Sequence, residues 1–228
     1  MILPQKIFGS SVGRKAVMAL TGVGLILFTI IHLAGHFLMF AGPDAINSYA
    51  FALKSNPALL WGARSGLLLT FVVHVGLAIN LTLENKRARG GVGYQYNNTV
   101  QASFASRTMI WTGMLVLAFV LFHLAHFTIF LVNPAYANLH DELGRHDVYS
   151  MMIVAFQAVP IGIGYIIAMA ILALHLSHGL PSMFQSIGWN SPRFDANFKR
   201  VGTVFAVLIF FGYSSLPVAV WLGVLRLQ

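Results

Sequence analysis

The sequence predicts an all-α integral membrane bundle of five transmembrane helices, with the N-terminus cytoplasmic and the C-terminus outside. Of the 228 residues, 57% are hydrophobic and only 9% are charged, and the mean hydropathy is +0.76. Such a composition is typical of a membrane protein rather than of a chain folded around one soluble core. We treat residues 1–228 as a single transmembrane domain.

Five apolar stretches are long enough to cross about 30 Å of hydrocarbon, which takes about 20 helical residues. They are Val17–Phe40, Leu59–Leu83, Thr108–Val132, Tyr149–Leu180 and Val201–Leu225. The segments between them are expected to be loops from their composition and length: Ala41–Ala58, Glu84–Arg107, Asn133–Val148 and Pro181–Arg200. We expect no internal repeat beyond the recurrence of histidine.

Lysine and arginine are distributed unevenly between the two sides of this predicted bundle. One side carries Lys6, Arg14, Lys15, Lys86, Arg87, Arg89, Arg107, Arg193, Lys199 and Arg200, and the other carries only Lys54, Arg64, Arg145 and Arg226. The positive-inside rule places the first group in the cytoplasm. Because these residues fall between apolar runs and not on a clustered solvated surface, no nucleic-acid partner is predicted.

The chain contains no cysteine. This excludes disulfides, a thiolate nucleophile, a covalently attached c-type haem and a cysteine-bound iron–sulfur cluster. Any such cluster must therefore be carried by a partner.

Seven of the nine histidines lie in the apolar segments, where an ionisable side chain is tolerated only when it is paired, ligated or hydrated. They occupy four of the five predicted helices: His32, His36, His74, His123, His126, His175 and His178. An interhelical hydrogen bond would account for any one of them. Seven across four helices favour a cofactor site.

The depths of these histidines arrange them in pairs. With a rise of about 1.5 Å per residue, His32 and His123 lie roughly 23 and 24 Å from the cytoplasmic ends of their helices. On the same scale His74 lies roughly 15 Å, and His175 roughly 9–14 Å, from that side. Two pairs, each from two helices and stacked at different depths, are what bis-imidazole ligation of two b haems requires. We therefore predict His32 with His123, and His74 with His175, as axial ligands.

A rival set remains open, because His36 and His126 also share a level, roughly 28 Å from the same side. A haem ring favours the apolar interior, which makes the deeper pair the better ligand choice. His36, His126 and His178 are then candidates for contact with a propionate or a quinone, or else form simple interfacial hydrogen bonds. Zinc is a poorer account, since no carboxylate or thiolate accompanies the histidines within the membrane.

A haem propionate also needs a partner, because an unpaired buried carboxylate is costly. For the outer haem we expect Arg64, or His36 and His126. For the inner haem we expect Ser106, Arg107 or the Arg14–Lys15 pair. Each of these residues would otherwise serve as an interfacial anchor.

Several long motifs resemble one family, the diheme cytochrome b membrane anchor of succinate dehydrogenases and fumarate reductases of the single-chain, five-helix type. The resemblance covers nearly the whole chain. It is carried by RKAVMALTGVGLILFTIIHL, GPDAINSYAFALKSNP, ARSGLLLTFVVHVGLAINLTLENKRAR, ASRTMIWTGMLVLAFVLFHLAHF, HDVYSMMIVAFQ and AMAILALHLSHGLPSMFQSIGWNSPRF. The family's ligand pattern, carried over to this sequence, gives His32 with His123 and His74 with His175.

The resemblance implies an electron-transfer subunit in a bacterial cytoplasmic membrane. A flavoprotein subunit oxidises succinate or reduces fumarate, an iron–sulfur subunit connects it to the membrane, and this chain exchanges electrons with quinone, in this family often menaquinone. The basic side would be the docking face. Some fumarate reductases of this type carry a glutamate two residues before the fourth ligand. Here that position is Ala173, which argues against a proton path through it.

Two other classes stay open. A diheme cytochrome b of a hydrogenase or formate dehydrogenase would keep the haems with other ligand spacings, and a histidine-bearing transporter would have no haem. We expect quinone at the outer end, near His36, Asn47, Tyr49, Arg64 and His126. The alternative is the inner end, near Ser106, Arg107, Trp111 and His178.

Overall fold

The computed structural model describes residues 9–88, 90, 103–189, 191 and 193–227. Within these residues five helices are long and apolar enough to cross a membrane, and no β-sheet is formed. They are α2 (Ser11–Phe37), α4 (Pro57–Ala88), α6 (Met109–Phe127), α8 (Val159–Ser186) and α9 (Asp195–Trp221). The all-α five-span bundle is confirmed, and the chain is a multi-pass membrane protein.

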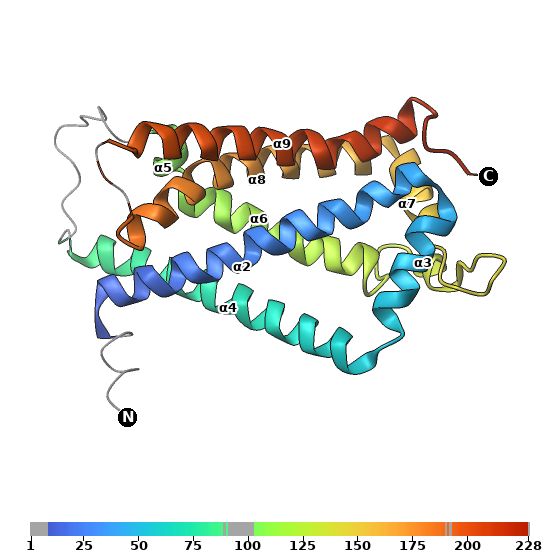
Figure 1. Cartoon of the computed structure of the whole chain (residues 1–228), viewed down its shortest axis with the longest axis horizontal. Coiled ribbons are helices and arrows are strands. Elements are labelled where there is room, and N and C mark those ends of the chain that lie inside the picture. The colour runs from blue at the N-terminus through green and yellow to red at the C-terminus, as the bar shows by residue number, and fades with distance from the viewer. Residues whose placement is uncertain (1–8, 89, 91–102, 190, 192, 228) are drawn as a thin grey trace.

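The five long helices lie along one another, with α8 beside α9 and with α2 running antiparallel to α4 (Figure 1). We name the end where α2 begins and α4 ends the basic end, and the opposite end the far end. At the basic end Arg14 of α2 forms an ion pair with Glu84 of α4 and donates to the Asn80 side chain at 2.8 Å. Lys6 and Arg89, which the sequence assigns to this end, lie outside the described residues.

The connection between α2 and α4 is more regular than the loop expected over Ala41–Ala58. It contains the 3-10 helix η1 (Leu38–Ala41) and the helix α3 (Pro43–Lys54). Gly42 has a φ of 106°, a conformation that favours glycine, and Pro43 takes the first helical position, where its missing N–H is not needed. The prediction of a loop from composition therefore missed helix α3, although Gly42 and Pro43 mark its start in the sequence.

The helix end expected at Leu180 does not occur. Helix α8 continues through Pro181 to Ser186. A Cβ added at Gly202 of α9 would lie 2.7 Å from Cδ of Pro181, so the absence of a side chain at this glycine leaves room for the proline ring. The prediction was wrong because the neighbouring helix accommodates what is normally a helix breaker.

The fourth apolar segment is not one helix from Tyr149 to Leu180 either. Helix α7 (Val148–Gln157) ends before Ala158, whose ψ is 94°, and α8 begins one residue later. Pro160 has no N–H to give to the carbonyl of Phe156 four residues earlier. That carbonyl instead accepts a hydrogen bond from the indole N–H of Trp221 at 2.8 Å, so α9 stabilises the break.

The third segment is shorter than expected. A separate turn, α5 (Phe104–Arg107), precedes α6, and α6 ends at Phe127 instead of continuing to Val132. Phe130 has a φ of 59°, which is incompatible with a continuing right-handed helix. The 3-10 helix η2 (Pro134–Asn138) follows in the loop toward α7.

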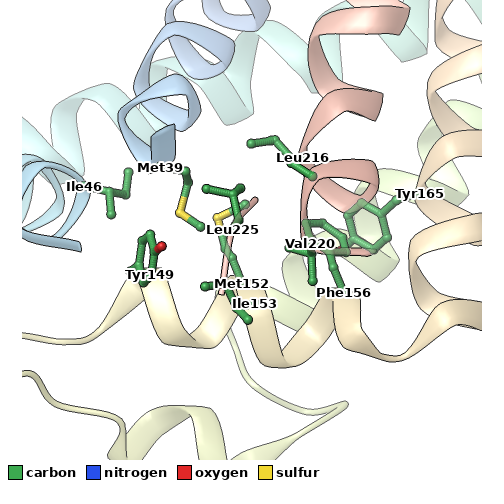
Figure 2. Close-up of a cluster of buried hydrophobic side chains, with 11 residues drawn as sticks. Met39, Ile46, Tyr149, Met152, Ile153, Phe156, Tyr165, Leu216, Val220 and Leu225 are labelled. Carbon is green, nitrogen blue, oxygen red and sulfur yellow. The ribbon is translucent and has the colours of Figure 1, made fainter. Parts of the chain in front are cut away.

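A large cluster of buried apolar side chains lies at the far end and surrounds α7 (Figure 2). It consists of Met39, Ile46, Tyr149, Met152, Ile153, Phe156, Tyr165, Leu216, Ala219, Val220 and Leu225. By contrast, α4 buries only Leu81 among its described residues. The far end is thus fixed by its own packing, whereas α4 leaves most of its surface for other contacts.

Candidate functional site

The seven membrane histidines lie on the four helices α2, α4, α6 and α8, and the structure brings His32 and His123 together. His32 of α2 and His123 of α6 face each other with ring centroids 6.0 Å apart and ring planes inclined at 88°. Two imidazoles that bind one metal ion through nitrogens at about 2 Å each have centroids roughly 6 Å apart. This spacing suits one shared iron between the two rings.

His36 lies one turn beyond His32 and contacts it directly. The two Nε2 atoms are 3.1 Å apart, and Tyr213 of α9 lies beside both rings. The Nδ1 atom of His36 is buried without a hydrogen-bond partner among the described residues. For Nε2 of His32 to bind a metal, the His36 imidazole would have to move off this nitrogen.

The second pair, His74 of α4 and His175 of α8, lies nearer the basic end. Nδ1 of His74 lies 3.1 Å from Oγ1 of Thr21 on α2, and Nδ1 of His175 lies 3.2 Å from Oγ1 of Thr112 on α6. Each ring is thus held by the neighbouring helix through Nδ1, and within the described residues neither Nε2 forms a hydrogen bond.

Two glycines make room for this second pair. A Cβ added at Gly22 would lie 3.5 Å from Cε1 of His74, and one added at Gly113 would lie 3.3 Å from Cε1 of His175. The imidazoles therefore pack closely against the backbones of α2 and α6. Of the small residues in these helices, these two have a direct role in placing the histidines.

His126 lies on α6 one turn beyond His123, and both rings lie beside Tyr165 of α8. His126 is 2% exposed, its Nδ1 lies 3.0 Å from the Tyr165 hydroxyl, and it stacks on Phe127 and approaches Tyr136. The same Tyr165 hydroxyl lies 3.4 Å from Nδ1 of His123. Tyr165 thus links His123 to His126, while the assignment of His126 to a propionate or quinone stays a prediction.

The other predicted contact residues lie at the two ends. Arg64 is exposed on α4 toward the far end, with its guanidinium 5.3 Å from the Trp61 ring centre. Ser106 and Arg107 lie in α5 at the basic end, and His178 lies in the last turns of α8, half-buried. Their roles toward propionates or quinone stay predictions.

A polar cluster joins the far-end loops, and we name it the far-end latch: Asp44, Asn47, Ser48, Asp141, Arg145 and Asp147. Arg145 donates to Asp141 at 2.8 Å, to Asp44 at 2.9 Å and to the Ser48 hydroxyl at 2.6 Å. Asn47 is therefore committed to a structural role in the loop, although the sequence placed it near quinone. Tyr49, proposed there with it, packs against Gly35 of α2.

Contacts within the latch lower the pKa values of two of its carboxyl groups, Asp141 and Asp147. Burial alone would raise the pKa of Asp141, but hydrogen bonds from Arg145 outweigh it and leave the pKa below its usual 3.8. Burial acts in the same sense on Asp147, and hydrogen bonds from Ser150 and Asn47 outweigh it there, so its pKa is also lowered. Next to the latch, burial and the charge of Lys54 lower the pKa of His146 below 6.5.

Sequence reasoning identified the four facing histidines but missed the groups that orient them, Thr21, Thr112 and Tyr165. A signal for the two threonines is present in the chain. The pattern M-x-x-T-G-x9-H-L-A occurs twice, at Met18–Ala34 and at Met109–Ala125. The expectation of no internal repeat beyond histidine was therefore wrong, because the repeat consists of a few spaced positions on two helix faces.

The chain matches no family model, no curated protein and no solved structure. The functional interpretation consequently rests on the geometry of the histidine pairs and on the motifs of the chain itself.

Proposed function

We propose that the chain is the diheme cytochrome b membrane anchor of a succinate dehydrogenase or fumarate reductase. In this role it carries electrons between an iron–sulfur subunit and membrane quinone through two b haems. The observation that carries the proposal is the presence of two histidine pairs, each bridging two helices, at two depths of one apolar bundle. We place it in the bacterial cytoplasmic membrane with the basic end in the cytoplasm.

Each pair supplies two imidazoles, and within the described residues no group of three or more histidine, aspartate or glutamate side chains is arranged to hold a metal ion. Such a pair suits a metal that brings its own in-plane ligands, as haem iron does. When bound, haem supplies one-electron redox chemistry. His32 and His123 would hold one haem iron, and His74 and His175 would hold the other.

The remaining groups are assigned by position. His36, freed from His32, is close to the far pair and available for a propionate or a quinone carbonyl, and Arg64 is the predicted cation at that end. At the basic end Ser106, Arg107 and His178 offer the corresponding donors. The basic end, with few acidic side chains, is the face where the iron–sulfur and flavoprotein subunits dock. Menaquinone at the far end is the terminal partner in this scheme.

The deciding experiment is to purify the chain with its partners from its source membrane and record a reduced-minus-oxidised spectrum. We expect two b-type haems with low-spin spectra that succinate reduces through a co-purified flavoprotein. Loss of quinone reduction in a His36 variant that keeps both haems would place quinone at the far end, and loss confined to a His178 variant would move it to the basic end.

Other outcomes separate the alternatives. Two haems that are reduced by hydrogen or formate, with a different partner, would assign the chain to the corresponding other class of diheme cytochrome b. A purified chain with no haem absorption would contradict the proposal and leave a histidine-bearing transporter as the better account.

A further inference from the structure

The hydrogen bonds around His74 fix which of its nitrogens carries the proton. The hydroxyl of Thr21 lies 3.0 Å from the Val17 carbonyl and 2.9 Å from the Met18 carbonyl, so its single hydrogen is given to its own helix. Nδ1 of His74 lies 3.1 Å from that hydroxyl oxygen and 3.2 Å from the Met18 carbonyl. A carbonyl only accepts, so Nδ1 is the donor, and Nε2 keeps the lone pair that binds a metal.

The same arrangement recurs around His175. The hydroxyl of Thr112 donates to the Met109 carbonyl at 3.0 Å, and Nδ1 of His175 lies 3.2 Å from the hydroxyl oxygen. Because the threonine gives its hydrogen to that carbonyl, its oxygen is the acceptor and Nδ1 of His175 is the donor. His175 is therefore held in the same protonation form as His74, by the equivalent positions of another helix.

The repeated motif contains the residues that support His74 and His175 at the same positions in both copies. In both copies of M-x-x-T-G-x9-H-L-A the methionine supplies the carbonyl, the threonine supplies the hydroxyl, and the glycine gives space for the imidazole. The histidines of the two copies, His32 and His123, form the far pair. Each motif helix thus contributes one ligand to the far pair and the support for one ligand of the second pair.

The far pair lacks such support. Nε2 of His32 contacts His36, and Nδ1 of His123 is 3.4 Å from the Tyr165 hydroxyl, which lies closer, at 3.0 Å, to His126. No backbone carbonyl fixes either ring of this pair in the hydrogen bonds of the described residues. The two pairs therefore differ in how far they are organised before a metal binds.

We propose that Thr21 and Thr112 are positioning residues that hold His74 and His175 in the Nδ1–H form, so that the second pair is prepared for its metal and the far pair is not. That this metal is haem iron rests on the proposed function. A partner on the other ring nitrogen fixes the orientation of a metal-binding histidine and raises its basicity, and loss of such a partner typically costs about 10–100-fold in metal affinity.

The first test uses the haem-free full chain, labelled with 15N histidine and reconstituted in lipid. Solid-state NMR distinguishes Nδ1–H from Nε2–H imidazole, and His74→Gln and His175→Gln variants assign the two signals. We expect both rings in the Nδ1–H form. A finding of Nε2–H at His74 and His175 would overturn the proposal regardless of any haem measurement.

The second test compares Thr21→Val and Thr112→Val with the wild-type full chain in a haem titration and a redox titration. Valine keeps the size of threonine and removes the acceptor, so we expect about 10–100-fold weaker haem binding at the second pair and an upward shift of its midpoint potential. Thr→Ser at both positions should restore both properties. The matched control is Thr29→Val, whose hydroxyl donates only to the Leu25 carbonyl of its own helix in the described residues.

The two proposals fail in different ways. Absence of haem from the wild-type chain contradicts the proposed function, and the NMR measurement still decides the role of the threonines. Two bound haems with affinities and potentials unchanged in both valine variants would overturn the positioning role and leave the proposed function intact. If a valine variant does not fold, the serine variant is studied in its place, and the tautomers measured in the wild-type chain decide the proposal.

Discussion

The side-chain amide of Asn47 lies 3.0 Å from a carboxylate oxygen of Asp147 and joins α3 to the start of α7. Asn47 is 1% exposed, and its amide also donates to Asp141 at 3.3 Å while its oxygen accepts the backbone N–H of Tyr149 at 3.1 Å. One buried side chain thus connects both far-end loops, and it uses its donor and its acceptor in doing so.

We predict that Asn47→Leu lowers the free energy of unfolding by about 1–3 kcal/mol, the usual cost of leaving a buried group such as the Tyr149 amide without a partner. Denaturant unfolding of the detergent-solubilised chain measures this. Asn138→Leu, at an exposed position of the neighbouring far-end loop, is the control and should change little. Equal stability of the two variants would show that the latch does not hold the far end.

Far-end stability should fall as the pH is lowered, in two windows. The folded state holds the pKa of His146 below its ordinary 6.5 and those of Asp141 and Asp147 below 3.8. Lowered pKa values mean that the unfolded chain binds more protons, so stability is present at higher pH and is lost as the pH falls. We expect one decrease below about pH 6.5 from the histidine and a second below about pH 4 from the carboxylates.

Melting temperatures recorded from pH 8 to pH 3 test this dependence. His146→Gln should flatten the first window only, and Asp147→Asn should reduce the second. A melting temperature that rises on acidification through either window would contradict the assigned directions.

Replacement of single histidines should remove one haem at a time. We expect His74→Ala or His175→Ala to lose the haem nearer the basic end, and His32→Ala or His123→Ala to lose the far one. Redox-resolved optical spectra of the purified membrane fraction count the haems, with His140→Ala in a loop as the control. Retention of both haems in His123→Ala, together with loss of one in a His36 or His126 variant, would refute the ligand assignment.

Gly113 should be sensitive to the size of its replacement. A Cβ at this position already lies 3.3 Å from the His175 ring, so alanine requires a small shift and valine displaces the imidazole. We expect Gly113→Val to weaken haem binding at the second pair by about 10-fold or more, measured by haem titration. Gly66→Val on α4 is the control, because a Cβ there meets nothing within 4 Å. Similar losses in both variants would point to a general packing defect.

The spans and the pairing of histidines were predictable because both depend on properties that accumulate along one helix. Hydropathy over about 20 residues gives a span, and the rise per residue sets the level at which His32 and His123 meet. The break at Ala158 and the passage of α8 through Pro181 were not predictable from local signals. They depend on Trp221 and Gly202 of α9, which are distant in the sequence.

In the candidate site, too, some residues could be predicted from the sequence and others could not. Histidines stand out in an apolar segment, whereas threonines such as Thr21 and Thr112 are common in helices and usually bond their own backbone. Only their placement opposite His74 and His175 gives them a further role, and that placement requires the packing of α2 on α4 and of α6 on α8.

The break between α7 and α8 has a consequence for the order in which the protein is made. The ribosome delivers the chain from its N-terminus, so α7 emerges before α9. Yet α7 is buried against Leu216, Val220 and Leu225, and its Phe156 carbonyl accepts a hydrogen bond from Trp221. Until that helix has entered the membrane, the face of α7 that packs against α9 stays uncovered. Closure of the far end is therefore a late step of biogenesis, completed after the four earlier spans are already inserted.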